Sequence, residues 1–194
     1  NIGKANALNY ALMMINRDPI TIVIDSDTKI TKSSIKELVF PMISDLFYDV
    51  VTGNPFVDNK STLLGKVQVL EFSSIIGLIR RAHQLFLGRH FTVSGCFTAY
   101  KTKALLKVGG FSANTVTEDI DVTWKLQKEG FLVGFSPKAI AYIQVPVTLK
   151  ELWIQRMRWA LGGWHLLRQH LDIFTKWRFR RLWFVYVNFF ISYI

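Results

Sequence analysis

A run of β-branched residues, Ile20-Thr-Ile-Val-Ile24, ends in two aspartates, Asp25 and Asp27. Such a run is typical of a strand buried in a parallel sheet, and the residues that follow it lie at the sheet edge where α/β proteins bind ligands. Further apolar runs alternate with segments of helical periodicity along the chain. The sequence therefore predicts an α/β fold with a polar site at one edge of its sheet.

The same patterns give the order of the expected elements. Helices are expected at residues 6–14, 33–46, 63–86, 103–108 and 118–128. Strands are expected at residues 20–25, 49–52, 91–100, 132–135 and 139–143. Arg80 and Arg81 should lie on the polar side of the longest helix. With 194 residues, 50% of them hydrophobic, the chain can bury one substantial core.

Basic residues gather towards the C-terminal end of the chain. The formal net charge is +10, and about half of the excess lies in residues 151–181, interleaved with tryptophans. This mixture suits a membrane–water interface. Residues 182–194 are almost wholly apolar, but a membrane-spanning helix needs about 20 residues. We expect the start of a transmembrane helix there, cut short, with its basic side towards the cytoplasm; the alternative is a buried core helix.

The first residues also indicate a shortened chain. Residue 1 is not methionine, and no signal peptide precedes the first helical pattern, so we expect the fold to be truncated at its N-terminus. The single cysteine, Cys96, excludes an intrachain disulfide and permits a reducing compartment.

Asp25 and Asp27 form the first candidate site. In the turn beyond the strand, both carboxylates can reach one hard cation, directly or through water. An oxygen-only ligand set favours Mg²⁺ or Mn²⁺ over Zn²⁺. The alternative is an Asp-Ser-Asp turn that caps the next helix.

Thr117-Glu118-Asp119 forms the second candidate site, at the start of an expected helix. Thr115 and Glu118 match a capping box, so helix stability alone could explain Glu118. Asp119 at a helix start facing the sheet edge could act as a general base for a hydroxyl group. Asp121 should project elsewhere and is expected to be an exposed or supporting residue.

Gln155, Arg158 and Trp159 share one face of an expected helix, whereas Arg156 does not. A guanidinium group on that face can bind diphosphate oxygens, and an indole ring can stack on a sugar. The alternative is an amphipathic helix that uses arginine and tryptophan only as membrane anchors.

Other classes of protein account for fewer of these features. A nucleic-acid binder would explain the net charge of +10, but it would not call for paired acids at strand and helix ends. The four histidines have no cysteine partners at zinc-ligand spacing. A catalytically silent membrane scaffold that keeps the fold stays open.

Six motifs resemble, in order, those of the processive family 2 glycosyltransferases, the group that contains cellulose, hyaluronan and poly-N-acetylglucosamine synthases. They are Gly3-Lys-Ala-Asn-Ala-Leu-Asn9, Asp25-Ser-Asp27, Val93-Ser-Gly-Cys96, Gly109-Gly-Phe111, Thr117-Glu-Asp119 and Gln155-Arg-Met-Arg-Trp159. Further segments, among them Val51-Thr-Gly-Asn-Pro55 and Arg158-Trp-Ala-Leu-Gly-Gly163, are most similar to bacterial poly-β-1,6-N-acetyl-D-glucosamine synthases.

This resemblance implies a GT-A nucleotide-sugar domain, Rossmann-like, and an inverting transfer from UDP-GlcNAc to a growing glycan. Asp25 and Asp27 would meet the metal, Mg²⁺ or Mn²⁺. The nucleotide sugar would be bound by Lys4, Asp25, Asp27, Gln155 and Arg158. The acceptor would be bound by Ser94, Gly95, Cys96, Glu118 and Trp159. Asp119 would be the catalytic base.

The resemblance also implies a division of the chain and a location. Residues 1–150 would be the C-terminal part of the GT-A domain, 151–181 an interfacial helix region, and 182–194 the start of a transmembrane segment. The catalytic domain would lie on the cytoplasmic side of the bacterial plasma membrane. Its partners would be a UDP-sugar, a glycan and the membrane, with a small membrane subunit among those the family allows, and no nucleic acid. Phe56, Asp58 and Leu161 depart from the subgroup's pattern, which leaves another UDP-sugar as an alternative donor.

Overall fold

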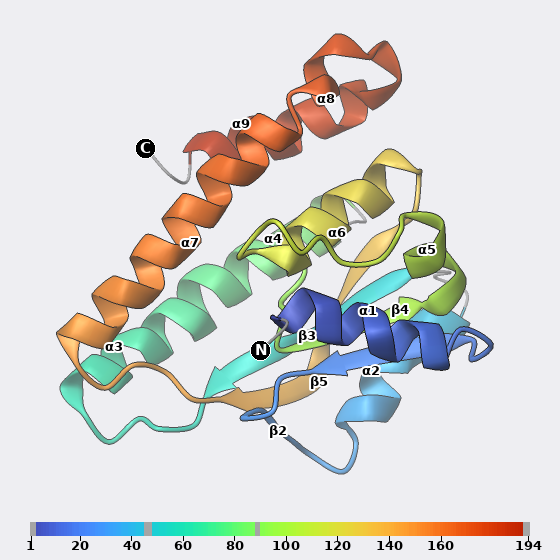
Figure 1. The fold of residues 1–194 in the computed structure, drawn as a ribbon. Helices are drawn as coiled ribbons and strands as arrows, with labels where there is room; N and C mark the ends of the chain where they lie inside the picture. The colour runs from blue at the N-terminus through green and yellow to red at the C-terminus, as the bar shows by residue number, and fades with distance from the viewer. Residues whose placement is uncertain (1–2, 45–47, 88–89, 192–194) are drawn as a thin grey trace.

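The computed structural model describes residues 3–44, 48–87 and 90–191. Its centre is a five-stranded sheet with strand order β1-β4-β3-β5-β2 (Figure 1). The strands are β1 (Ile20–Ile24), β2 (Lys29–Ile30), β3 (Val50–Val57), β4 (Phe97–Lys101) and β5 (Val133–Ile143). The predicted α/β class is confirmed.

The directions of the strands differ in part from the prediction. β3 and β5 are parallel, but β1 pairs antiparallel with β4, and β2 pairs antiparallel with β5. A β-branched run reports burial and extended backbone, and it carries no information on the direction of the neighbouring strand. The expectation that the 20–25 run belongs to a parallel pair is therefore wrong for the neighbour that the structure describes.

Helices surround this sheet. They are α1 (Lys4–Met14), α2 (Ser34–Ile43), α3 (Leu63–Leu70), α4 (Gly77–Leu87), α5 (Thr102–Lys107), α6 (Glu118–Lys128), α7 (Leu149–Gln169), α8 (Asp172–Thr175) and α9 (Trp183–Ile191). The expected long helix at 63–86 is one helical run in which a π-helical segment, η1 (Glu71–Ile76), joins α3 to α4. A 3₁₀-helix, η2 (Trp177–Leu182), precedes α9. The expected helix at 33–46 ends at Ile43, and residues 45–47 lie outside the described ranges.

Three strand predictions need correction. The strand expected at 49–52 continues to Val57, because a register shift between Thr52 and Asn54 carries Gly53-Asn54-Pro55 through the sheet. The strand expected from residue 91 begins only at Phe97, and the preceding residues form a loop. The two strands expected at 132–135 and 139–143 are one strand, β5.

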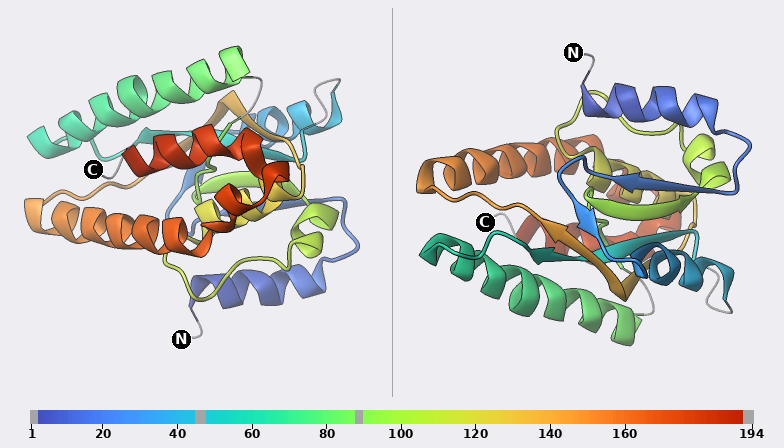
Figure 2. Two further views of the ribbon diagram at one scale, coloured as in Figure 1. Left: turned by 90° about the horizontal axis from the view of Figure 1, so that it is seen from above. Right: turned by 90° about the horizontal axis from the view of Figure 1, so that it is seen from below.

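Two apolar layers cover the faces of the sheet. Val50 and its neighbour Val51 are both fully buried but belong to different clusters, as the alternation of side chains along a strand requires. The cluster with Val50 includes residues of α1, α5 and α6, and the cluster with Val51 includes Leu38 and Met42 of α2. Figure 2 shows α1 and the α3–α4 run on opposite sides of the molecule.

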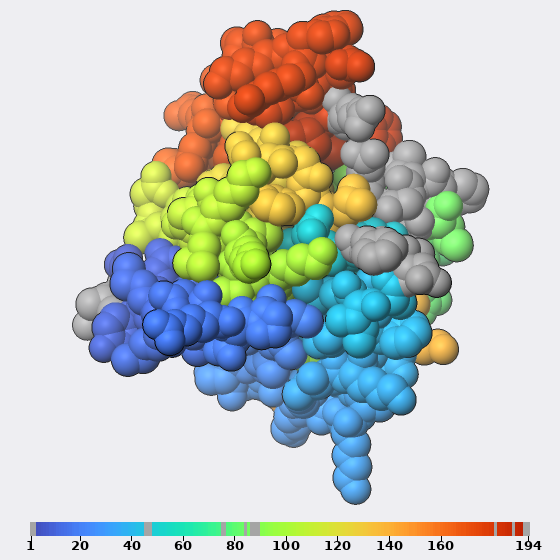
Figure 3. All heavy atoms as spheres, turned by 90° about the vertical axis from the view of Figure 1, so that its right-hand side faces the viewer, coloured from blue at the N-terminus to red at the C-terminus, as the bar shows by residue number. Residues whose placement is uncertain are grey.

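A third apolar cluster joins the C-terminal helices to α6. Trp124 of α6 packs with Leu167 of α7, Ile173 of α8, and Val185 and Tyr186 of α9. The C-terminal segment consequently forms one end of the molecule, next to α6 (Figure 3). Within residues 3–44, 48–87 and 90–191, none of the helices combines the length and the apolar character needed to cross a bilayer.

Candidate active site

One cavity of about 710 Å³ is lined by every residue proposed for the site. The contributing segments are the start of α1, the turn after β1, the loop before β4, the start of α6 and the middle of α7. Its lining includes Lys4, Asp25, Asp27, Ser94, Gly95, Cys96, Glu118, Asp119, Gln155, Arg158 and Trp159. Segments that are distant in the sequence, among them the α3–α4 run and the end of β5, therefore meet around a single space.

Lys4 links two of the acidic segments. Its ammonium nitrogen lies 2.6 Å from Asp25 Oδ1 and 3.1 Å from Glu118 Oε1. Burial alone would lower the pKa of Lys4, but the hydrogen bond to Asp25 and the charge of Glu118 raise it above its ordinary value. The cavity thus holds a firmly protonated amine between two carboxylates.

Asp119 lies at the start of α6 with both carboxylate oxygens held by the backbone. Oδ2 accepts a hydrogen bond from Gly95 N at 2.8 Å, and Oδ1 accepts one from Ile120 N at 2.9 Å. Burial and then the charge of Glu118 raise the pKa of Asp119 to about 6, although the two N–H donors and Lys4 oppose the shift. This carboxylate is more basic than usual and is still mostly ionised at neutral pH, as a general base requires.

Gly95 permits this arrangement because it lacks a side chain. A methyl group added at Gly95 would lie 2.9 Å from Asp119 Oδ2 and 3.3 Å from its Cβ. The loop before β4 can therefore bring its N–H group to the carboxylate only with glycine at this position. On either side of it, the Ser94 hydroxyl and the Cys96 thiol are 3.2 Å apart and also line the cavity.

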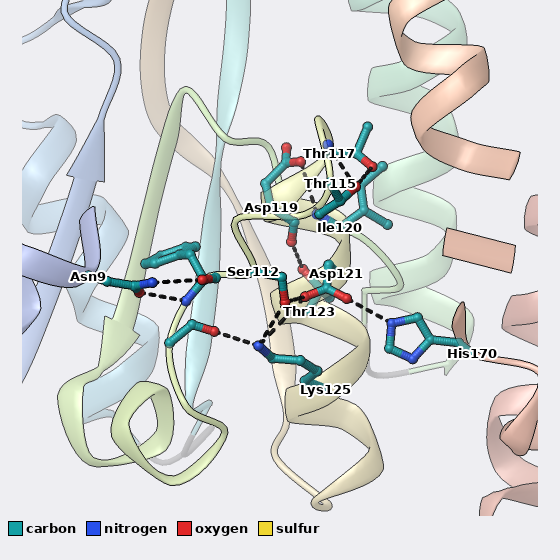
Figure 4. Close-up of polar contacts among 12 residues, drawn as sticks. Asn9, Ser112, Thr115, Thr117, Asp119, Ile120, Asp121, Thr123, Lys125 and His170 are labelled. Atoms are coloured by element: carbon teal, nitrogen blue, oxygen red, sulfur yellow. Dashed lines mark hydrogen bonds and ion pairs between the residues drawn. The ribbon is translucent and has the colours of Figure 1, made fainter. Parts of the chain in front are cut away.

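Asp121 is predicted to be either an exposed or a supporting residue, and the structure contradicts the exposed alternative only. It is fully buried, its Oδ1 lies 2.9 Å from His170 Nε2, and it accepts a hydrogen bond from the Ser112 hydroxyl (Figure 4). Lys125 Nζ lies 3.6 Å from its other oxygen. The residue points away from the cavity, as helical spacing predicts, but the surface on that side is covered by residues from α7 onwards.

The capping box expected from Thr115 and Glu118 is also wrong. Thr117 is the N-cap residue of α6, and its side chain makes no capping hydrogen bond. Glu118 instead pairs with Lys4, because the cavity brings a cation within 3.1 Å of its carboxylate. The chain does contain a capping box at the start of α7, between Thr148 and Glu151.

The face of α7 that lines the cavity has the predicted composition. Gln155, Arg158 and Trp159 are cavity residues, while Arg156 pairs with Glu71 of η1 at 2.6 Å. The Arg156 guanidinium also lies over the Trp159 ring, 4.7 Å from its centroid. The π-helical segment thus fixes α7 beside the cavity through Arg156.

A second contact sets the distance between α7 and α6. Gly162 of α7 packs against Thr117, so that an added methyl group would lie 2.6 Å from Thr117 Cγ2. The helix that carries Arg158 therefore rests directly on the residue that precedes the acidic pair Glu118-Asp119.

The carboxylates of Asp25 and Asp27 suit a divalent cation that has few protein ligands. Across the described ranges, no three His, Cys, Asp or Glu side chains gather in a way that could hold a metal ion. Mg²⁺ and Mn²⁺ commonly bind through one or two carboxylates and take water and phosphate oxygens as their other ligands. The two aspartates at the cavity therefore fit such an ion and a diphosphate together.

Sequence patterns did not single out Phe72 and Arg80, which line the cavity from η1 and α4. The sequence predicts both Arg80 and Arg81 on the polar side of this helix; Arg81 is exposed, whereas Arg80 is only partly exposed and lines the cavity. The π-helical turn changes the angular position of every residue after it, so a regular helical projection from residue 63 onwards fails at α4. Only that irregularity could have indicated the inward direction of Arg80.

The match to a family model decides the family. The model described as Glycosyl transferase family group 2 matches residues 20–194. The chain belongs to glycosyl transferase family group 2. In this family 2 member, the cavity described above is consequently the candidate catalytic centre.

Two similar relatives are staphylococcal synthases. The chain is 39% identical over 181 residues to poly-β-1,6-N-acetyl-D-glucosamine synthase of Staphylococcus aureus, a match that covers 93% of this chain and 43% of that protein. It is 40% identical over 167 residues to the enzyme of the same name in Staphylococcus epidermidis, covering 86% of this chain and 40% of the relative. The family 2 chain thus spans less than half the length of these relatives.

A solved structure supports the GT-A-like fold. A mannosyltransferase from Pyrobaculum calidifontis, in complex with GDP-Man and Mn²⁺, superposes with a TM-score of 0.65 at 18% sequence identity. The similarity covers 88% of this chain and 44% of the mannosyltransferase. The expected glycosyltransferase fold of the family 2 chain is confirmed.

Proposed function

We propose that this chain carries the catalytic cavity of an inverting, processive synthase that transfers N-acetylglucosamine from UDP-GlcNAc to a β-1,6-linked polysaccharide. The staphylococcal relatives make the GlcNAc polymer the best-supported product class. One observation carries the proposal: the partly buried carboxylate of Asp119, with a pKa of about 6, shares a single cavity with the aspartate pair and with Arg158 and Trp159.

Asp119 is the proposed base of a single displacement. The acceptor hydroxyl oxygen attacks the anomeric carbon of the donor sugar, the bond from that carbon to the UDP oxygen breaks, and UDP leaves with the bonding electrons. Asp119 takes the proton from the attacking hydroxyl group. The N–H groups of Gly95 and Ile120 hold the carboxylate in position before the acceptor arrives.

The cationic residues are the proposed partners of the diphosphate. Lys4 already lies between Asp25 and Glu118, and Arg158 reaches the cavity from α7, so both can approach negative charge on the departing UDP. A Mg²⁺ or Mn²⁺ ion on Asp25 and Asp27 would supply further positive charge to the diphosphate when bound. Asp27 is exposed and has room to turn towards such an ion.

The proposed location is the cytoplasmic side of the bacterial plasma membrane. Exposed apolar side chains follow one another along α7 at helical spacing, namely Trp153, Met157, Leu161 and Trp164. Phe184, Val187 and Ile191 are exposed on α9. These side chains, beside the basic residues of 151–181, fit a membrane interface, with residues 182–194 leading into a transmembrane segment. The proposed partners at the membrane include a small membrane subunit.

The test is transfer by the full-length protein in membranes. With UDP-GlcNAc, UDP-glucose and UDP-glucuronic acid supplied separately, we expect UDP release and a growing polymer with UDP-GlcNAc alone. Polymer formation from another UDP-sugar would replace the donor but keep the reaction. UDP release from none of them would favour the catalytically silent scaffold.

A further inference from the structure

Arg80 is a cationic residue of the cavity to which the proposed reaction assigns no role. It reaches the cavity from α4, on the same helical run as Phe72. Arg80 is only partly exposed, and the Nη1 atom of its guanidinium is buried without a hydrogen-bond partner among the described residues. A buried donor that lacks a partner is costly, and such a group at a cavity wall is commonly satisfied by a ligand.

Arg80 also brings a charge that no carboxylate pairs with closely. Within the described ranges, no acidic oxygen lies within 4.0 Å of its side-chain nitrogens. Burial lowers the pKa of Arg80, but the charges of Cys96 and Asp119 oppose that shift, and a guanidinium group remains protonated in a protein. The cavity wall at α4 therefore presents a permanent cation with free hydrogen-bond donors.

The position of Arg80 separates it from the residues proposed for the diphosphate. Its electrostatic neighbours include Asp119, Cys96 and His90, whereas Lys4 contacts Asp25 and Glu118. Lys4 begins α1 and Arg80 belongs to α4, and Figure 2 shows these two helices on opposite sides of the molecule. Asp119 is an electrostatic neighbour of both cationic groups. The donor diphosphate belongs on the Lys4 side, which leaves Arg80 on the side from which the attacking hydroxyl group must come.

We infer that Arg80 binds the acceptor glycan, with its guanidinium donating hydrogen bonds to uncharged oxygens of the terminal sugar, a hydroxyl or an amide carbonyl. This inference rests on the proposed transfer reaction. A planar guanidinium offers two parallel donors and can fix the orientation of a sugar ring as well as its position. The hydroxyl group is then held against Asp119 while the aromatic side chains of Phe72 and Trp159 supply apolar surface around the ring.

The experiment compares Arg80→Gln with Arg81→Gln in the full-length protein. Arg81 is the adjacent residue, is exposed, and has no part in the cavity, so it controls for the loss of one positive charge from the same helix. The measurements are the KM for a β-1,6-linked GlcNAc oligosaccharide acceptor, the affinity for UDP, and the hydrolysis of UDP-GlcNAc in the absence of acceptor. The melting temperature reports whether each variant folds.

We expect Arg80→Gln to raise the acceptor KM roughly 10- to 100-fold, the range for loss of a hydrogen bond to a charged group, with UDP affinity and donor hydrolysis within about twofold of the parent. Arg81→Gln should leave all three unchanged. If Arg80→Gln does not fold, Arg80→Lys carries the test, with a smaller rise in the same KM because the charge remains and the planar fork is lost.

Two results would overturn the inference. An unchanged acceptor KM in a folded Arg80 variant would show that the guanidinium does not contact the acceptor. A loss of UDP affinity equal to the loss of acceptor affinity would place Arg80 on the donor diphosphate. Failure of the proposed function looks different, because the parent protein would then transfer no sugar to the oligosaccharide at all.

Discussion

The carboxylate of Asp121 lies 2.9 Å from the imidazole of His170, although 49 residues separate the two along the chain. Both residues are buried, at 0% and 2% exposure. The contact joins α6, whose first turn carries Asp119, to the C-terminal end of α7, whose middle carries Arg158 and Trp159. The two helices that carry the proposed base and the cationic face are thus held together by a polar contact outside the cavity.

Asp121→Asn should therefore reduce stability more than chemistry. Removal of the charge leaves His170, Ser112 and Lys125 with a weaker partner, and we expect the free energy of unfolding to fall by about 2–4 kcal/mol. The rate of transfer per folded molecule should stay within about threefold of the parent. Thermal unfolding and transfer measured on the same sample separate the two effects.

Glu129→Gln is the matched control for this variant. Glu129 forms an exposed pair with Lys107 near the end of the same helix, at 3.3 Å, and the loss of this pair should change stability by less than about 0.5 kcal/mol.

The stabilising effect of Asp121 should also depend on pH. Burial raises the pKa of Asp121, but its contacts with His170, Ser112 and Lys125 outweigh this and lower the pKa below its ordinary value. The stabilising effect should therefore be present at neutral pH and be lost as pH falls through that lowered pKa. An Asp121→Asn variant with parental stability and poor transfer would assign Asp121 to the chemistry.

Asp119→Asn should abolish most of the transfer activity. The amide keeps the size of the side chain but cannot accept the proton, so we expect transfer to slow by roughly 10²- to 10⁴-fold with UDP affinity nearly intact. The measurement is the rate of polymer elongation beside equilibrium binding of UDP. Elongation at the parental rate would mean that another group takes the proton.

The pH dependence of transfer should report the raised pKa of Asp119. Because the base must be ionised, kcat/KM should be level above about pH 7 and fall about tenfold per unit as pH drops below about 6. Glu118→Gln removes a negative charge that raises this pKa, so the midpoint should move to lower pH. A profile that stays flat down to pH 5 in the parent would contradict the assignment of Asp119 as the base.

Transfer should also depend on a divalent cation. Chelation should stop UDP-sugar turnover, and Mg²⁺ or Mn²⁺ should restore it where Zn²⁺ does not, because the candidate ligands Asp25 and Asp27 supply only oxygen. Asp27→Ala should raise the metal concentration needed for half-maximal activity. Full activity in EDTA would exclude the proposed metal site.

Exposed apolar residues of α7 should attach the 194-residue chain to anionic vesicles. Trp153 and Leu161 are 68% and 63% exposed, so Trp153→Gln with Leu161→Gln should weaken vesicle binding roughly tenfold without disturbing the core. Met13→Gln, at a residue of α1 that is 71% exposed, controls for the loss of exposed apolar area elsewhere. Co-flotation with phosphatidylglycerol vesicles measures the effect, and equal flotation of both variants would remove α7 from the proposed interface.

A shortened chain is a less suitable test of membrane binding than these substitutions. A chain that ended near residue 147 would lose Leu167, Ile173 and Tyr186, which pack on Trp124 of α6. Such a chain would expose a large aromatic residue that is buried here, and its solubility would report that damage as well as any loss of membrane contact.

Local patterns predicted the cavity well because its residues lie where strands and helices end. The turn after β1 and the start of α6 both follow recognisable changes of periodicity, and the spacing of Gln155, Arg158 and Trp159 predicted their common face. The structure places all of these residues around one space. Their chemical roles remain predictions.

Features that depend on distant contacts were not predictable in this way. The burial of Asp121 requires His170, and the position of Arg156 requires Glu71, which is 85 residues away. The partner of Glu118 is Lys4, which lies near the N-terminus and far from Glu118 in the sequence. A local capping pattern therefore predicted the wrong role for Glu118. Arg80 lines the cavity from a helix that follows a π-helical segment, and the apolar periodicity of the sequence does not indicate that segment.

Gly162 has a consequence for the polymer that such a cavity could accommodate. Its bare backbone rests on Thr117, one helical turn beyond Arg158 and Trp159, so α7 cannot move closer to α6 and cannot carry a larger residue at this point without moving away. The spacing of these two cavity walls therefore depends on a residue that does not itself line the cavity. A single methyl group at Gly162 would act as a spacer between the two walls, and substrate selectivity would respond to it as it does to residues of the lining.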